Sequence, residues 1–166
     1  MTGNFLVRIF EHNNWANQRI LEACSTLTNE QLDAQPQSIT KGTIRETMIH
    51  LVGSQAGYLS LLTLPLEERQ YEPLQMEDLQ DSLRKSGDGL LSIARGEKEP
   101  LSTNLQTRDG YHAEPWVVMV QIINHAHEHR EQICSMLNAL GVTPPDLDGW
   151  EYGLATNMLV KINDSD

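Results

Sequence analysis

The chain has 166 residues, 39% of them hydrophobic, which allows one well-buried core but is too short for two comfortable domains. Its 23 acidic and 12 basic residues give a formal net charge of −11, and the basic residues are scattered singly. A surface of this sign repels phosphate backbones and anionic lipids, so we expect no nucleic acid and no membrane as partner. A small-molecule substrate or another protein remains.

The N-terminus and the cysteines bear on the compartment. A broken apolar stretch without a small-residue cleavage site opens the chain, so we expect no signal peptide. The two cysteines, Cys24 and Cys134, lie far apart in sequence and are typical of free thiols in a reducing compartment. We therefore predict a cytoplasmic protein.

Helical periodicity dominates from the first residues onward. A first helix is predicted where positions recur in steps of three and four, at Leu6, Ile9, Asn13, Ala16, Ile20, Ala23 and Leu27. Thr28 and Gln31 then form a capping-box pattern for a short helix that ends before Pro36.

A second long helix begins near Thr43, which forms another capping-box pattern with Glu46, and Pro65 stops it. Its apolar face runs through Ile44, Met48, Leu51, Gln55, Tyr58 and Leu62. A third helical segment shows the same spacing at Met76, Leu79, Leu83, Ser86, Leu90 and Ile93.

Residues 97–113 interrupt the helical pattern and predict a loop with a small hairpin at Asp109-Gly110. The fourth helix opens at Pro115 and closes at Gly141, which suits a left-handed C-terminal cap. Trp150, Tyr152 and Leu154 are expected to pack back on the bundle, and residues 155–166 to fray. Residues 1–166 thus predict a single all-α domain, a four-helix bundle with long crossover connections.

Two of the six histidines share one face of the fourth helix. His125 and His129 are four residues apart, so they lie about 40° from each other, close enough for two imidazoles to reach one ion. Apolar residues on the same face indicate that the pair points inward. His50, one position from Leu51 on the second helix, is the candidate third ligand. From the residues alone, a hydrogen-bonded core pair and an ordinary helix-flank histidine remain alternatives.

Other residues near these histidines have two interpretations each. Asn13 could hydrogen-bond a ligand imidazole or form an interhelical hydrogen bond. Glu46 could orient His50 or cap its helix, and Arg130 could bind an anionic substrate group or form a surface salt bridge. We expect the remaining histidines to face solvent and Cys134 to be no ligand, because it lies on the far side of its helix; those histidines are His12, His112 and His127.

Three stretches resemble a known family: HNNWANQRIL (12–21), TIRETMIHLV (43–52) and INHAHEHREQICSMLNALGVTPPDLD (123–148). They are similar to the DinB-like (DinB/YfiT-like) family of metal-binding four-helix bundles. The resemblance implies a three-histidine metal site and favours His50 as its third ligand. Glu131 stands where the family commonly has glycine, and we expect it to face outward or to form a dimer contact.

The resemblance also implies a homodimer, and the family includes transferases that use low-molecular-weight thiols such as bacillithiol or mycothiol. We therefore expect one divalent metal ion (zinc, nickel, iron or cobalt) with at least one open coordination position. A thiol bound there would become a thiolate nucleophile, which predicts a thiol S-transferase. Hydrolysis by metal-bound water, or a non-enzymatic metal-stabilised bundle acting as an interaction module, are the alternatives.

Overall fold

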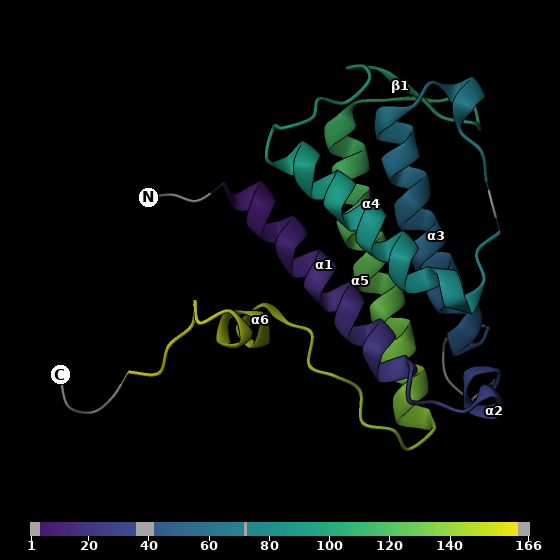
Figure 1. The fold of residues 1–166 in the computed structure, drawn as a ribbon, viewed down its shortest axis with the longest axis vertical. Helices are drawn as coiled ribbons and strands as arrows, with labels where there is room; N and C mark the ends of the chain where they lie inside the picture. The colour runs from purple at the N-terminus through teal and green to yellow at the C-terminus, as the bar shows by residue number, and fades with distance from the viewer. Residues whose placement is uncertain (1–3, 36–41, 72, 163–166) are drawn as a thin grey trace.

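The computed structural model describes residues 4–35, 42–71 and 73–162 (Figure 1). Four long helices form the bundle: α1 (Phe5–Cys24), α3 (Ile44–Thr63), α4 (Leu79–Ala94) and α5 (Pro115–Ala139). The shorter elements are α2 (Asn29–Leu32), the 3-10 turns η1 (Leu66–Glu68) and η2 (Met76–Asp78), α6 (Gly149–Ala155), and the antiparallel strands β1 (Leu105–Gln106) and β2 (His112–Ala113). The predicted all-α bundle is confirmed. Within the described ranges, no helix has the length and apolarity to cross a membrane.

Long connections determine which helices become neighbours. α1 packs on α4 and α5, and α3 also packs on α4 and α5, so α1 and α3 lie at opposite corners of the bundle. The helix pairs that follow each other directly among these four, α1 with α3 and α4 with α5, therefore occupy diagonal corners, which confirms the predicted crossover connections. After α3 the chain returns along the outside of that helix, so that α3 and α4 run in the same direction (Figure 1). We call residues 64–71 and 73–78 the return segment.

The helix ends follow the capping signals in the sequence. Thr28 and Thr43 each accept a hydrogen bond from the backbone N–H three residues on, and Gln31 and Glu46 complete the two capping boxes. Gly141 follows α5 with φ +73°, a left-handed conformation that glycine adopts without steric strain. The hairpin expected at Asp109-Gly110 is present, and Met76 lies in a 3-10 turn before α4.

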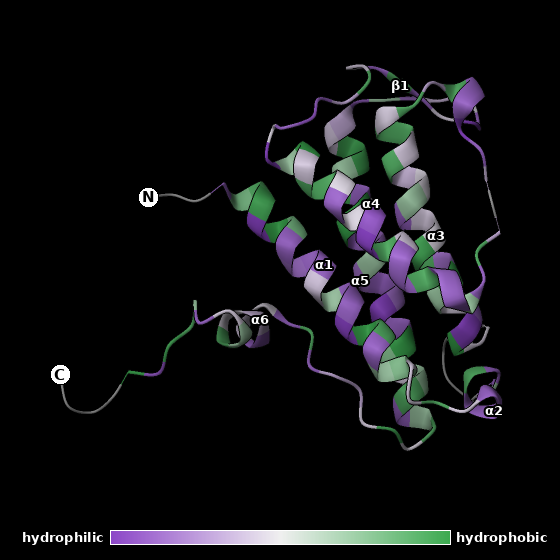
Figure 2. Ribbon diagram, in the orientation of Figure 1, coloured by the Kyte–Doolittle hydropathy of each residue, from purple (hydrophilic) through white to green (hydrophobic). Residues whose placement is uncertain are grey.

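The buried face of α1 differs from the predicted seam. Leu6 and Ile9 are 40% and 44% exposed, whereas Phe10 and Asn17 are fully buried. The first turns of α1 lie at the edge of the bundle (Figure 1). Phe10 nevertheless belongs to a buried hydrophobic cluster. The seam positions between residues 13 and 20 are buried as predicted, so the difference lies in the first turns of the helix. Hydrophobic and hydrophilic residues alternate along each long helix, as Figure 2 shows, and this pattern indicates an apolar face without fixing its edges.

Two glycines allow α4 to approach its neighbours closely. A Cβ added at Gly89 would lie 2.6 Å from the Cδ2 atom of Leu59 on α3. A Cβ added at Gly87 would lie 2.9 Å from the Oδ1 atom of Asn14 on α1. The glycines of the SGDGLL stretch therefore serve helix packing.

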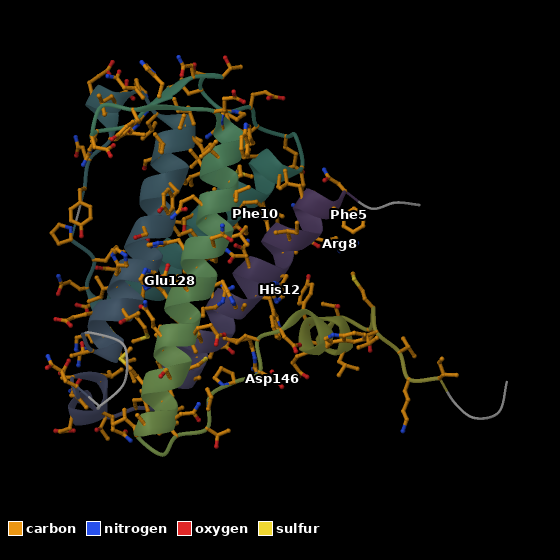
Figure 3. All side chains as sticks on the ribbon, turned by 180° about the vertical axis from the view of Figure 1, so that it is seen from behind. Phe5, Arg8, Phe10, His12, Glu128 and Asp146 are labelled. Carbon is orange, nitrogen blue, oxygen red and sulfur yellow. The ribbon has the colours of Figure 1, made fainter. Side chains whose placement is uncertain are left out.

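The C-terminal segment projects from the bundle on the side of the α1 N-terminus (Figures 1 and 3). Trp150 and Leu154 are 70% and 52% exposed, so the expectation that they pack on the bundle is wrong. Tyr152 alone of the three packs there, with its ring centroid 5.4 Å from those of His12 and Trp15. α6 is too short to present more than one side to α1. Of the predicted frayed tail, residues 163–166 lie outside the described residues.

Candidate metal centre

The packing of α3 against α5 brings three histidines together, and we call them the histidine cluster: His50, His125 and His129. One ligand nitrogen of each ring lies within 4.8 Å of the other two. The ring centroid of His50 is 5.0 Å from that of His125 and 4.6 Å from that of His129. The two centroids on α5 are 4.3 Å apart, which follows from their spacing of four residues on one helix face.

The hydrogen bonds of the cluster fit a bound cation. The Nε2 atom of His125 is buried and has no hydrogen-bond partner among the described residues, an arrangement that costs free energy without a ligand. The Nδ1 atom of His129 lies 2.7 Å from Oε1 of Gln132. An amide oxygen only accepts, so Nδ1 of His129 carries the proton and its Nε2 lone pair is free. Three imidazole nitrogens are a donor set that suits a divalent ion.

Two of the three rings, those of His125 and His50, favour their neutral form. Burial, followed by the proximity of His129 and His50, lowers the pKa of His125 to about 4, although Glu128 opposes this shift. Burial and the neighbouring His129 also lower the pKa of His50. Neutral imidazole is the form that binds a metal, so no proton needs to leave these two rings at neutral pH.

The cluster opens to solvent on the side of α3. His50 is exposed and the two α5 histidines are half-buried, so the expected inward orientation is corrected. His112 and His127 are exposed as expected. His12 is not, because its Nε2 atom lies 2.9 Å from the backbone oxygen of Leu147, near Asp146 in Figure 3.

Of the two interpretations given for Glu46 and for Asn13, the structure shows helix capping for Glu46 and an interhelical hydrogen bond for Asn13. The carboxylate of Glu46 accepts a 3.0 Å hydrogen bond from the backbone N–H of Thr43 and therefore caps α3. Asn13 donates to Oε1 of Gln55 over 3.5 Å and accepts a hydrogen bond from Arg130, so it links helices. Glu131 faces solvent, as expected for the position that departs from the family pattern.

Arg130 differs from both of its predicted roles. It is only 3% exposed, and its Nη1 atom donates to Oδ1 of Asn13 at 2.9 Å and to Oδ1 of Asn17 at 2.6 Å. The amide of Asn17 donates to Gln55, which in turn donates to Ser86 at 2.9 Å. These side chains join all four long helices, and we call them the buried network: Asn13, Asn17, Gln55, Ser86 and Arg130. Arg130 lies four residues after the buried Ala126 and three before the buried Ile133, so its side chain points into the core.

Sequence reasoning missed the hydrogen bond of Gln132 to His129 and the contact of Tyr58 with His125. Gln132 follows His129 by three residues, a spacing that places both on one helix face and could have indicated the contact. The Tyr58 ring meets the His125 ring edge-on, at a centroid distance of 5.7 Å. Nothing in the sequence pattern distinguishes this tyrosine from an ordinary member of the apolar face of α3.

Neither cysteine belongs to the histidine cluster. Both thiols are free, and burial raises the pKa of Cys24 to about 12 and that of Cys134 to about 11. Proximity of Cys134 adds to the shift at Cys24, so two residues far apart in sequence are neighbours across α1 and α5. A thiol with such a pKa is protonated and unreactive at neutral pH.

A groove of about 400 Å³ begins at His50 and follows α3. One wall is the face of α3 that carries Gly53, Gly57 and Tyr58. The opposite wall comes from the return segment, at residues 69–71, and from the hairpin turn, at residues 107–108. The histidine cluster therefore lies at one end of a space large enough for a small molecule.

Comparison with known proteins agrees with this geometry. A model of the DinB family matches residues 1–159. The protein DinB of Bacillus subtilis (strain 168) is 24% identical over 165 residues, covering 91% of this chain and 93% of its own. A crystal structure of a DinB-family protein from Exiguobacterium sibiricum 255-15 has a TM-score of 0.69 at 20% identity, over 89% of this chain and 99% of that one. A DinB-like protein from Bacillus cereus ATCC 10987 has a TM-score of 0.62 at 19% identity, over 86% and 95%. At such identities the two structures show a common fold.

Proposed function

This chain belongs to the DinB family, and on that basis we propose that it is a metal-dependent enzyme, most specifically a thiol S-transferase. The observation that carries the proposal is the open cluster: three imidazoles with ligand nitrogens within 4.8 Å, one of them orphaned, at the end of a groove. His50, His125 and His129 would hold one divalent ion. Such an ion, when bound, supplies a Lewis acid that lowers the pKa of a thiol.

The protein's own residues would orient the reactants. By accepting a hydrogen bond from Nδ1 of His129, Gln132 would keep this ring in the tautomer that leaves the Nε2 lone pair available to the ion. Tyr58 packs edge-on against His125 and also lines the groove, so it would connect the cluster to a molecule in the groove. Because the pKa values of Cys24 and Cys134 are raised, the nucleophilic sulfur has to come from a substrate.

The proposed reaction forms one bond and breaks one. The sulfur of a small thiol attacks an electrophilic carbon of the second substrate, and a carbon–sulfur bond forms. The leaving group, for example chloride, departs with the bonding electron pair, and the thiol proton passes to solvent. The groove would hold the two reactants together, which is the contribution expected of a positioning site.

The test combines metal content with a conjugation assay. Untagged protein loaded with zinc, nickel, iron or cobalt is incubated with a panel of small thiols and 1-chloro-2,4-dinitrobenzene, and the thioether is quantified. We expect thioether formation above the uncatalysed rate, lost in His125→Ala and kept in His127→Ala, an exposed histidine on the same helix. Absence of catalysis with every metal and thiol would refute the transferase proposal.

The alternatives on the same site receive their own assay. Hydrolysis is tested by replacing thiol and electrophile with an activated ester, using the same four metals and both variants. A metal-stabilised interaction module would need a closed site, and the exposure of His50 beside an open groove argues for the enzyme instead.

A further inference from the structure

Two arginines line the groove that begins at His50. Arg69 follows η1 on the return segment, and Arg108 lies in the turn between β1 and β2. Arg69 donates from Nε to the backbone oxygen of Leu64 at 2.8 Å and from Nη1 to that of Gln106 at 2.5 Å. Arg108 donates to the backbone oxygen of Arg69. The return segment and the hairpin are thus held together by the same two side chains that line the groove.

This pair of cations lacks the neutralisation that other basic residues receive. In the parts of the chain that the structure describes, neither guanidinium forms an ion pair with a carboxylate. Most other basic residues there do so: Arg8, Arg19, Arg45, Arg84, Lys85 and Arg95. Burial and the neighbouring Arg108 lower the pKa of Arg69, with Glu67 opposing, as expected for two cations side by side. In a chain of net charge −11, such a pair at a groove points to an anionic ligand.

The groove has the shape for an extended molecule. Its α3 wall runs from His50 to Leu61, a rise of about 16 Å along the helix axis. Gly57 forms part of this wall, and a Cβ added there would meet nothing within 4 Å. Tyr58 and Leu61 offer apolar surface between the two polar regions. A molecule with an apolar body and an anionic group would match the groove along its length.

We propose that the groove binds the substrate, with a carboxylate or phosphate group at Arg69 and Arg108 and the reactive end at the histidine cluster. The position of the reactive end rests on the proposed function, whereas anion binding by the two arginines does not. The substrate class is then an anionic small thiol, or an anionic electrophile that meets the thiol in the groove. A carboxylate and a phosphate each bind a guanidinium pair through charge-assisted hydrogen bonds.

The first experiment uses metal-free protein, so that it is independent of catalysis. Inorganic phosphate and succinate are titrated separately while the Nε–Hε NMR signals of the arginines are recorded. We expect saturable shifts at Arg69 and Arg108 with at least one anion, weakened about tenfold in Arg108→Gln and unchanged in Arg19→Gln. Arg19 is an exposed arginine on α1, so its variant changes the net charge equally. If neither phosphate nor succinate shifts the signal of Arg69 or Arg108, the inference is overturned and the proposed function is left untouched.

The second experiment uses metal-loaded protein and two forms of one thiol, glutathione and its diethyl ester. We expect Arg108→Gln to lower kcat/KM for the free acid about tenfold and to leave the ester unchanged. Gly57→Leu, which fills the open part of the groove, should raise KM for both forms at unchanged metal content. An equal loss for acid and ester in Arg108→Gln, or an unchanged KM in Gly57→Leu, contradicts the inference while conjugation itself persists. If no thiol reacts at all, the proposed function fails and the first experiment still decides anion binding.

Discussion

The buried network and the histidine cluster lie on neighbouring turns of α3 and α5, yet they are built in opposite ways. In the buried network each amide and the guanidinium bond to one another, and the side chains are almost inaccessible to solvent. In the histidine cluster the rings converge on one point, and Nε2 of His125 has no partner within the described part of the chain. Polar side chains that satisfy one another stabilise a bundle, whereas converging lone pairs without a donor indicate a ligand.

The largest expected effect comes from removing a cluster histidine. His125→Ala should raise the Kd for zinc at least a thousandfold, about 4 kcal/mol, because one of three ligands is lost. Metal content by mass spectrometry should fall from about one ion per chain to near zero. His127→Ala, two residues away on the exposed side of α5, should keep its metal. Equal metal loss in both variants would mean that the ion binds elsewhere.

The second effect concerns the buried network alone. Arg130→Met leaves the Oδ1 atoms of Asn13 and Asn17 buried without their donor, so the free energy of unfolding should fall by about 3 kcal/mol. Urea unfolding measures this loss, and metal content should stay near wild type. The control is Arg19→Met, whose exposed pair with Glu22 is worth about 0.5 kcal/mol or less. Metal loss in folded Arg130→Met would show that the two regions are not separate.

A third change weakens the cluster without removing a ligand. Gln132→Ala removes the acceptor of the Nδ1–H hydrogen bond of His129, so the orientation of this ring is no longer fixed. Zinc affinity should fall about tenfold to a hundredfold, as is usual when a ligand histidine loses its hydrogen-bond partner. Competition with a chromophoric chelator measures this affinity. Asn138→Ala, at an exposed position of α5, supplies the control. An unchanged affinity would assign Gln132 to packing only.

The smallest expected effect is on the pH dependence of the free energy of unfolding of the metal-free protein, to which the histidine cluster contributes. The pKa of His125 is about 4 in the folded chain and ordinarily 6.5, so between these values the unfolded chain binds the extra proton. The free energy of unfolding should therefore be full above pH 6.5 and decrease as the pH falls toward 4. We expect about 1 kcal/mol over this window, because solvent screens the half-exposed ring. His125→Ala should flatten the curve in thermal melts, whereas a slope equal to that of the wild type would assign it to other groups.

Local features of the structure were predictable from the sequence because local chemistry determines them. The capping threonines, the C-terminal Gly141 and the spacing of His125 and His129 act within a few residues. The DinB resemblance, taken from three stretches, is confirmed by the family match over residues 1–159. Metal binding by the three histidines stays a prediction, although the fold brings them together.

The choice of tertiary partners was not predictable in the same way. Arg130 finds Asn13 and Asn17 more than a hundred residues away, and nothing in its own helix indicates that contact. Arg69 and Arg108 meet only because the return segment and the hairpin both turn over the same end of α3. A helical pattern indicates which face is apolar but not which helix lies against it, so the exposed side of the cluster and the groove beside it required the packed structure.

The division of the histidine cluster between α3 and α5 has a consequence for folding. His50 and His125 are about 75 residues apart in sequence, so an ion bound to both would be a reversible cross-link that closes a long loop of the chain. The unfolded chain has no such preformed site, and an ion at a hundred times its Kd would add about 2.7 kcal/mol to the free energy of unfolding. The melting temperature of a purified sample would then serve as a gauge of how many molecules carry the ion.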